Sequence, residues 1–489
     1  MNKVTRREAL QAAGMVLAAT ATGVRLQAQD AAATQVVLGP VMKTLSAYMA
    51  DGPKHILPPD VVEHAKHHIL DTFAAMISGS QLPPGAMAVK FARAQAGKGT
   101  ATVVGSTVLA GPIEAALANG LLAQSDETDD SHNPSQSHPG APVVSASLAA
   151  GEEFDVDGMH FLRAVTLGYD IGPRVTMAMG GFEFRDESHM ATHAIAGVFG
   201  AAAAAGCCAR LSVQQIRWML DYTAQQSSGI GAWGRDTDHI EKGFVFGGMP
   251  ARSGVTAALL VQLGWNGIDD IFSGPDNFFQ AYAPKAKPGM LVEELGSRYE
   301  ITRTDIKKWT VGTPIQAPLD AVENIRTKHP FEADQVKIVV VKLAPSVAAV
   351  VDNRDIPDIC LQHMVAVMLL DKTASFKAAH DKARMQDAAV LRQRAKVQLV
   401  KDEALVPMLP VRVADVEITL MDGTRLTERV TAVRGTPRNP MTRQEIVTKA
   451  RDLIDPVLGA AKGAKLVDTV YALEGVAKIR SIRPLLQLA

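Results

Sequence analysis

The chain has 489 residues and a formal net charge of −1, with 47% hydrophobic and 21% charged residues. This composition is typical of a globular protein, and the length exceeds what one ordinary core organises, so we expect two domains. The nearly neutral charge and the 5% aromatic content disfavour nucleic acid or an anionic membrane as partner. Cys207, Cys208 and Cys360 supply neither a disulfide framework nor the spaced thiolates of an iron–sulfur cluster.

The N-terminal segment is predicted to be a targeting signal. Thr5-Arg6-Arg7-Glu8-Ala9-Leu10 is a twin-arginine pattern, and the apolar run that continues to Val24 is short for a membrane span. We therefore expect residues 1–28 to be a signal peptide and the folded protein to be exported to the periplasm. The alternatives are a cytoplasmic protein with a basic start and a retained anchor.

Helical periodicity dominates the first half of the remaining chain. A helix is expected after Pro58-Pro59 and ends at Gly79, and alanine-rich runs at 111–123 and 194–208 read as buried helices. Another long helix is expected from Asp157 to Met179, with Pro173 bending it or ending it early. Ser212-Val213-Gln214-Gln215 is a capping-box pattern that opens the next helix.

A polar loop separates two of these apolar helices, at residues 124–140. It holds four acids and two histidines, namely Asp126, Glu127, Asp129, Asp130, His132 and His138. Acid–base chemistry needs carboxylates and imidazoles held close together, where burial and mutual repulsion change their pKa values. The alternative is a solvated loop whose Asp and Ser residues cap helices.

Further candidates follow along the chain. His189 and His193 stand at the start of the small apolar run, where a helix N-terminus disfavours the charged form of an imidazole. Lys242 lies in a glycine-rich passage that lacks P-loop spacing, and it is a candidate anchor for a substrate carboxylate. Taken alone, each of these residues is also compatible with a structural or surface role.

The chain changes character after Trp265. Strand-like runs are expected at 336–343, 411–420 and 425–430, with Asp422-Gly423 as a hairpin turn and a helix at 360–370. Residues 303–435 therefore form a predicted α+β unit. Helices are expected again at 445–458 and 464–479, so the chain returns to the helical domain. The predicted domains are 36–302 and 436–489, both helical, and the inserted 303–435.

Several stretches match the motifs of one protein family in the same order. They are His68-Ile69-Leu70-Asp71-Thr72-Phe73, the loop from Asn119-Gly120 through Asp129-Asp130-Ser131-His132 to His138-Pro139-Gly140, Phe199-Gly200-Ala201-Ala202, the segment from Lys242 to Gly254, and Lys307-Lys308-Trp309 before Pro318-Leu319-Asp320-Ala321. On these residues the chain resembles the MmgE/PrpD family, which includes 2-methylcitrate dehydratase, cis-aconitate decarboxylase and iminodisuccinate epimerase. The resemblance covers about residues 38 to 485.

The resemblance implies an active site with specific departures. The family's leading aspartate falls on Glu127, or on Asp126 if the loop shifts by one, and its threonine falls on Ser131. Trp309-Thr310 replaces the usual Tyr-Pro. For the second histidine His193 is preferred to His189. The implied catalytic residues are Glu127, Ser131, His138, His193, Lys242 and Lys307, and the implied substrate contacts are Asp126, Asp130, His132 and His189.

The resemblance also implies a fold and a function. The fold would be mainly α, with a large helical domain formed by both chain ends and an inserted α+β lid domain, assembled as a homodimer without metal or cofactor. The function would be that of a lyase that removes a proton next to a carboxylate of a small di- or tricarboxylate. We expect a 2-methylcitrate dehydratase-like hydro-lyase with no nucleic-acid or membrane partner. A decarboxylase, an epimerase and an exported non-catalytic carboxylate-binding protein are the alternatives.

Overall fold

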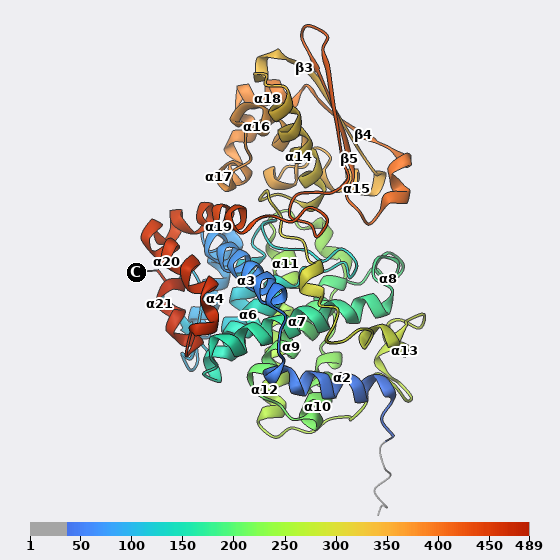
Figure 1. Cartoon of the computed structure of the whole chain (residues 1–489), viewed down its shortest axis with the longest axis vertical. Helices are drawn as coiled ribbons and strands as arrows, with labels where there is room; N and C mark the ends of the chain where they lie inside the picture. Colours follow the sequence, from blue (N-terminus) through green and yellow to red (C-terminus); the bar gives the residue numbers. More distant parts are fainter. Residues whose placement is uncertain (1–36, 489) are drawn as a thin grey trace, which may run out of the picture. The chain divides into compact units, whose positions relative to one another are not determined.

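The computed structural model describes residues 37–488, and the predicted signal peptide at 1–28 lies outside them. The described residues are mainly helical, with one two-stranded and one four-stranded sheet (Figure 1). The expectation of a mainly α protein is therefore confirmed.

The first half of the chain is helical apart from one short hairpin. Its elements are α2 (Pro40–Asp51), α3 (Pro59–Gly79), α4 (Pro83–Ala94), β1 (Ala101–Thr102), β2 (Leu109–Ala110), α5 (Pro112–Ala123), α6 (Gly140–Glu153), α7 (Gly158–Met179), α8 (Phe182–Ser188), α9 (Thr192–Cys208), α10 (Val213–Gln225), α11 (Ile240–Gly243), the π-helical segment η3 (Phe244–Gly248), α12 (Met249–Gln262) and α13 (Phe278–Tyr282). Ser212 and Gln215 form the expected capping box at α10.

Helix α9 lies at the centre of this part, because every one of its residues is buried. It packs against α6, α7 and α12. Small side chains make the close contact possible: a Cβ added at Gly172 of α7 would lie 2.4 Å from the Ala196 carbonyl oxygen. Of the two effects expected of Pro173, an early end of α7 is wrong, because α7 continues to Met179, and a bend at Pro173 stays a prediction. A proline removes one helical hydrogen bond, and burial along nearly the whole helix outweighs that loss.

Residues Ile240–Gln262, from α11 to α12, are the one stretch in the described part of the chain that is long and apolar enough to cross a membrane. Its most apolar window is 67% buried inside the fold, as in the core helix of a globular protein.

The rest of the chain adds the four-stranded sheet and further helices. The elements are α14 (Thr313–Lys328), β3 (Val336–Leu343), α15 (Pro345–Val351), α16 (Leu361–Asp371), α17 (Phe376–His380), α18 (Ala388–Arg394), β4 (Val397–Lys401), β5 (Ala414–Leu420), β6 (Arg425–Val430), α19 (Arg443–Leu458), α20 (Ala460–Tyr471) and α21 (Arg483–Leu486). The strand order is β4-β3-β5-β6, with β3 and β4 parallel and the other pairs antiparallel.

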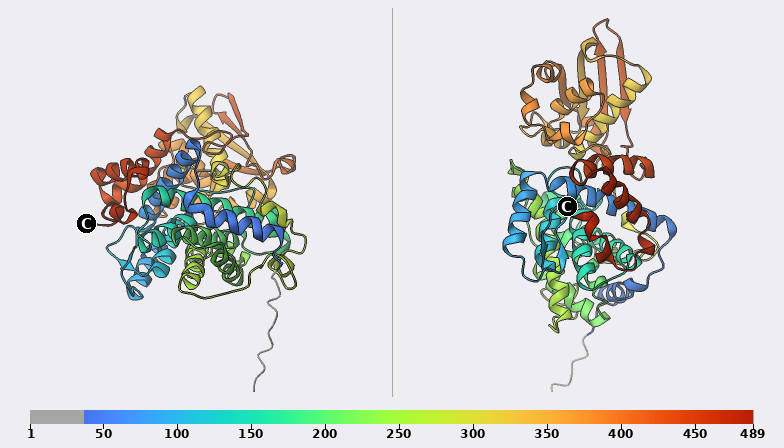
Figure 2. Two further views of the ribbon diagram at one scale, coloured as in Figure 1. Left: turned by 60° about the horizontal axis from the view of Figure 1, so that its bottom comes forward. Right: turned by 90° about the vertical axis from the view of Figure 1, so that its left-hand side faces the viewer.

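Buried apolar side chains form two large clusters. The larger draws on residues between 42 and 306 and again between 441 and 486, and the smaller draws on residues between 309 and 433. Helix α19 packs on α3, which brings the late and early parts of the chain side by side (Figures 1 and 2). The predicted strand at 411–420 begins later, at Ala414, because the Val411 amide donates to the Met408 carbonyl in a turn.

Candidate active site

The acidic loop between α5 and α6 is buried, with only Asn133, Pro134 and His138 partly accessible between residues 124 and 140. It is therefore not the solvated surface loop that composition also allowed. Buried carboxylates are costly unless they are paired or hydrogen-bonded. The loop's acids are thus expected to have specific partners, and the structure supplies them.

Glu127 and Asp129 lie against two lysines from distant segments. The Lys242 ammonium contacts the Glu127 carboxylate, and Lys307 Nζ lies 3.6 Å from Glu127 Oε2 and 3.4 Å from Asp129 Oδ1. Lys307 also donates to the Glu127 carbonyl oxygen at 2.9 Å. Burial alone would raise the pKa of Glu127, but the charges of Lys242 and Lys307 hold it well below its usual value. The cluster therefore holds ionised carboxylates and cationic lysines together.

Two imidazoles complete this cluster. His138 Nδ1 lies 3.0 Å from both Asp129 oxygens, and since a carboxylate accepts, Nδ1 donates and Nε2 is the ring nitrogen left to exchange a proton. The His193 ring lies 5.3 Å from the His138 ring, centroid to centroid, and stacks on Phe246 at 3.8 Å. Burial, and then the charge of His138, hold the pKa of His193 well below its usual value. His193 is therefore a neutral imidazole beside His138.

Close backbone packing positions Lys242 and Phe246. A Cβ added at Gly120 of α5 would lie 2.3 Å from the Gly247 carbonyl oxygen of η3. Glycine at both positions therefore lets η3 approach α5 directly before α5 enters the acidic loop. Short π-helical segments frequently occur at functional sites, because the extra residue redirects side chains.

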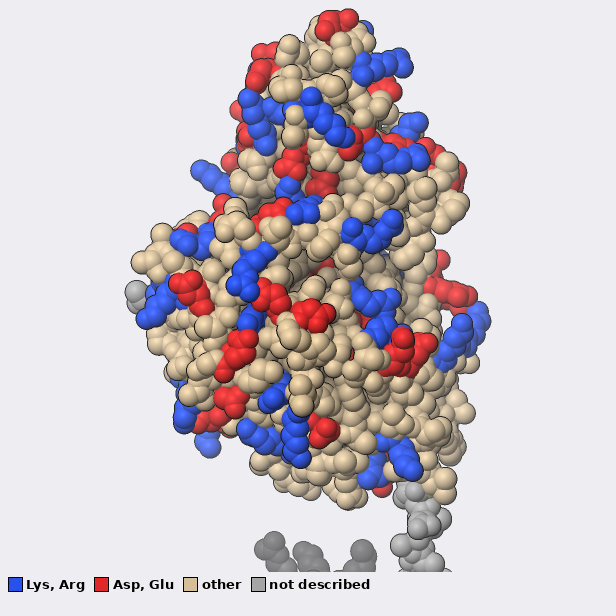
Figure 3. Space-filling model, viewed as in Figure 1, with Lys and Arg blue, Asp and Glu red and all other residues tan. Residues whose placement is uncertain are grey.

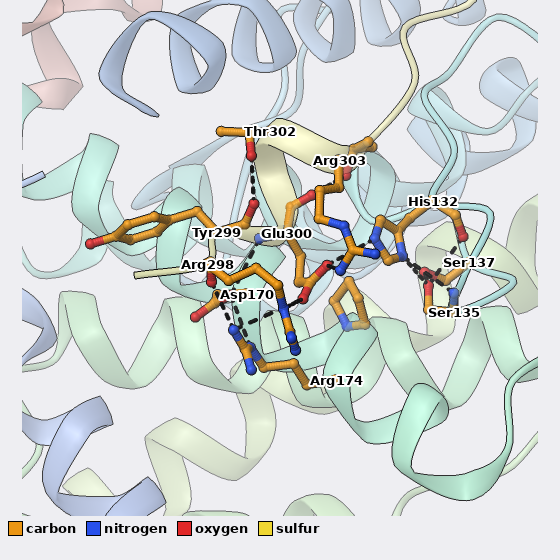
Figure 4. Close-up of polar contacts among 12 residues, drawn as sticks. His132, Ser135, Ser137, Asp170, Arg174, Arg298, Tyr299, Glu300, Thr302 and Arg303 are labelled. Atoms are coloured by element: carbon orange, nitrogen blue, oxygen red, sulfur yellow. Dashed lines mark hydrogen bonds and ion pairs between the residues drawn. The ribbon is translucent and has the colours of Figure 1, made fainter. Parts of the chain in front are cut away.

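His132 lies in a separate polar network (Figure 4). Its Nδ1 is 2.8 Å from Ser135 Oγ and its Nε2 is 3.2 Å from Glu300 Oε2. Arg298 and Arg303 also pair with Glu300. Burial would raise the pKa of Glu300, but the His132 contact and the charge of Arg303 lower it to about 2. Both His132 nitrogens are therefore occupied by protein groups.

Asp130 and His189 also lie outside the cluster. Asp130 accepts from the Tyr169 hydroxyl at 2.5 Å and from the Gly140 amide at 2.9 Å, and His68 Nδ1 lies 2.8 Å from it. His189 is exposed at the end of α8, with φ 58°. Of the two candidate histidines, the structure thus brings His193 to His138. The substrate contacts expected of Asp130, His132 and His189 stay predictions.

The structure adds groups that sequence reasoning missed. His380, at the end of α17, places Nε2 2.9 Å from Asp126 Oδ2, as an ion pair rather than an aligned hydrogen bond. Asp358 is buried nearby, and burial, with the charges of Glu127 and Asp126, raises its pKa to about 7. His239 Nδ1 lies 4.0 Å from Glu127 Oε1. Each of these residues is isolated in sequence, so only the tertiary fold reveals its place.

Ser131 lies at the edge of the cluster. Its backbone bridges to that of Asp305, and its buried Oγ has no hydrogen-bond partner among the described residues. Across the same part of the chain, no group of three or more His, Cys, Asp or Glu side chains has the arrangement of a metal site. Acids, imidazoles and ammonium groups held together in this way can carry out proton transfer next to a stabilised negative charge.

Curated relatives carry related names. The cis-aconitate decarboxylase-like protein oryM of Aspergillus oryzae is 27% identical over 301 residues, 57% of this chain and 61% of the relative, which is less than two thirds of the relative's length. Cis-aconitate decarboxylase of Aspergillus terreus is 24% identical over 462 residues, 88% of this chain and 92% of the relative. The human cis-aconitate decarboxylase is 24% identical over 436 residues, 85% of this chain and 88% of the relative.

Two family models match the chain in succession. The MmgE/PrpD N-terminal domain matches residues 43–291, and the MmgE/PrpD C-terminal domain matches residues 309–474. Together they cover most of both hydrophobic clusters and most residues of the candidate site, and Lys307 lies in the short gap between the two matches. The chain therefore belongs to the MmgE/PrpD family.

Proposed function

We propose that the protein is a lyase that acts on a small di- or tricarboxylate through a carbanion next to a carboxylate. The observation that carries the proposal is the pair of adjacent imidazoles, His138 and His193, beside the ammonium groups of Lys242 and Lys307. Negative charge that builds up beside a carboxylate needs cations, and fixed cations in a buried site stabilise it without reorganisation. The lysines supply these cations, and the imidazoles move the proton.

Decarboxylation and dehydration share this carbanion but differ in the bond that breaks. In decarboxylation the carbon–carbon bond to a carboxylate breaks, CO₂ leaves, and an imidazole that has taken up a proton from water gives it to the electron pair left on carbon. In dehydration a base takes the α-proton, and an acid protonates the hydroxyl that leaves the β-carbon. The names of the relatives favour decarboxylation, and a 2-methylcitrate dehydratase-like hydro-lyase is the alternative.

We propose further that residues 303–435 act as a lid domain over a helical domain made of 36–302 and 436–489. In support, most of the segment has a hydrophobic cluster of its own, and His380 from this segment pairs with Asp126 of the acidic loop. Lids of this kind exclude water from the reacting groups. Export to the periplasm, predicted from the N-terminal residues, stays a prediction that cell fractionation would test. Assembly as a homodimer, implied by the family resemblance, stays a prediction that light scattering would test.

The proposed activity is tested by proton exchange. Purified protein is incubated in D₂O with a panel of di- and tricarboxylates, including cis-aconitate and 2-methylcitrate, and followed by NMR. We expect deuterium at a carbon next to a carboxylate, with CO₂ release or a new alkene naming the second step. His138→Ala should lower the rate by about 10²–10⁴-fold, the usual contribution of a positioned acid or base, without changing the melting temperature.

The control is the exposed histidine His329 at the end of α14, whose replacement by Ala should leave the exchange rate within about twofold of the wild type. Exchange that survives in His138→Ala would remove His138 from the mechanism. Binding of the acids without any exchange by the wild type would instead favour the non-catalytic carboxylate-binding protein.

A further inference from the structure

A cavity of about 400 Å³ lies beside the catalytic cluster, and Ser131 and Lys307 belong to its wall. The rest of its lining comes from Asn133 and Pro134 of the acidic loop, from the inserted segment, and from the residues that directly follow that segment up to Arg438. The cavity is strongly cationic: its lining includes Arg303, Lys307, Arg412, Arg434 and Arg438, and among the described lining residues Asp305 is the one acid. On the face shown in Figure 3, by contrast, both signs of charge are interspersed.

Two other cations of the cavity wall are held by carboxylates of the described chain, and Arg412 is not. Arg303 pairs with Glu300 at 2.8 Å and Arg434 with Glu445 at 2.9 Å. Arg412 Nε is buried and has no hydrogen-bond partner among the described residues. Burial, with the nearby charge of Arg185, lowers the pKa of Arg412 to about 10, so the side chain is still charged near neutral pH. A buried guanidinium nitrogen without a hydrogen-bond partner is costly and requires an explanation.

Other polar groups of the cavity wall also fit an anionic ligand. Ser131 Oγ is a second buried atom without a partner among the described residues. The Asp305 carboxylate accepts from Asn133 Nδ2 at 2.7 Å, and burial, with the charge of Asp130, raises the pKa of Asp305 to about 7. Near neutral pH Asp305 is therefore partly protonated and able to donate to an anion. The cavity thus offers an unpaired guanidinium and two hydroxyl-type donors.

We propose that this cavity binds a carboxylate of the substrate that takes no part in the proton transfer, with Arg412 as the main contact and Ser131 as the second. The inference rests on the proposed function for the identity of the ligand as a polycarboxylate. In the proposed reaction Lys242 and Lys307 already stabilise the substrate carboxylate at the reacting centre. A further cation next to them selects a tricarboxylate over a dicarboxylate. Arg412 is in this view a specificity-determining residue.

The test compares two unreactive acids. Tricarballylate has three carboxylates, and glutarate has the same chain without the central one. Binding to the full chain is measured by titration calorimetry for the wild type, Arg412→Gln, Arg412→Lys and the control Arg425→Gln, which removes an exposed arginine of β6. Arg412→Gln loses a charged hydrogen bond to the third carboxylate. We therefore expect this variant to bind tricarballylate about ten- to hundredfold more weakly than the wild type does.

Glutarate binding is expected to change less than about twofold in Arg412→Gln, and Arg425→Gln should bind both acids as the wild type does. Arg412→Lys keeps the charge but loses the forked donors, so it should fall between the wild type and Arg412→Gln. Equal weakening for both acids, or unchanged tricarballylate binding in Arg412→Gln, would overturn the proposal. Failure of the wild type to bind tricarballylate would overturn it as well.

Thermal unfolding separates a binding role from a structural one. Because Arg412 Nε has no hydrogen-bond partner among the described residues, the melting temperature of Arg412→Gln without ligand should equal or exceed that of the wild type. Tricarballylate should raise the melting temperature of the wild type more than that of the variant. A clear drop in the melting temperature of the ligand-free variant would show a structural arginine and overturn the proposal.

The two proposals fail in different ways. If the wild type turns over a polycarboxylate but tricarballylate binding does not depend on Arg412, the subsite is wrong and the lyase stands. If tricarballylate binding depends on Arg412 but no acid in the panel exchanges a proton, the subsite stands and the catalytic proposal fails.

Discussion

Replacing His380 by Gln should change how stability depends on pH. His380 Nδ1 lies 2.7 Å from the Phe376 carbonyl oxygen, which only accepts, so Nδ1 carries a proton. In the neutral ring the Nε2 lone pair would then face the Asp126 carboxylate at 2.9 Å. Burial would lower the pKa of His380, but the contact with Asp126 and the charges of Asp126 and Asp358 raise it to about 9. The folded protein therefore holds an imidazolium here.

The sign and size of the effect follow from linkage. A folded pKa of about 9 against an unfolded value of about 6.5 means that the folded state binds this proton more tightly. The resulting stability is fully present below pH 6.5 and is lost as the pH rises to 9. A difference of about 2.5 pKa units, at about 1.4 kcal/mol each, sets a ceiling of about 3 kcal/mol.

The assay is urea unfolding of the wild type and His380→Gln at pH values from 6 to 9.5. The stability gap between them should be largest near pH 6 and shrink by up to about 3 kcal/mol toward pH 9.5. His363→Gln is the matched control: His363 is also buried in the inserted segment, but burial lowers its pKa to about 4. Its gap should not vary above pH 6.5. A constant gap for His380→Gln would refute a buried imidazolium at this position.

Two further substitutions test the packing under the site. Lys449→Met leaves the carboxylate of Asp71, 2.6 Å from Lys449 Nζ, buried without its cation, so calorimetry should show a loss of about 3–5 kcal/mol that Asp71→Asn in the same chain partly restores. An unchanged melting temperature would contradict this account. Gly120→Ala places a methyl group against the backbone of Gly247, which should cost about 1–3 kcal/mol in urea unfolding. Gly289→Ala, with open space around the new Cβ, is the control, and equal losses in both would argue against the close contact.

Helices and strands with strong local signals were predictable. The run at 111–123 is found as α5 (Pro112–Ala123), which leads into the acidic loop, and the return strand at 425–430 is found as β6. Strand β4 was missed, because two of its last three residues are exposed and it shows little alternation between apolar and polar residues. The π-helical turn of η3 was missed as well, since its cause is the tight contact with α5 and not a pattern within the segment.

The residues of the site likewise divide into those with a local sequence signal and those placed only by the tertiary fold. The acidic loop with His138 is a dense run of ionisable residues, which composition and a family resemblance both single out. His380 and Arg412 lie far away along the chain, and nothing in their immediate sequence distinguishes them from surface residues. Their roles depend on burial and on the groups that the fold places opposite them. Such information exists only in three dimensions.

The contact of Lys449 also has a consequence for biosynthesis. Lys449 donates to the Thr128 carbonyl of the acidic loop, 321 residues earlier in the chain, and to Asp71, 378 residues earlier. At the usual pace of translation, the loop leaves the ribosome roughly 20 to 60 s before the lysine that supports it. During that interval Asp71 lacks the cation, and the Thr128 carbonyl lacks the donor, that each has in the finished fold. The acidic loop is therefore expected to order late, when α19 docks on α3, so that a nascent chain does not complete the candidate site before it is nearly finished.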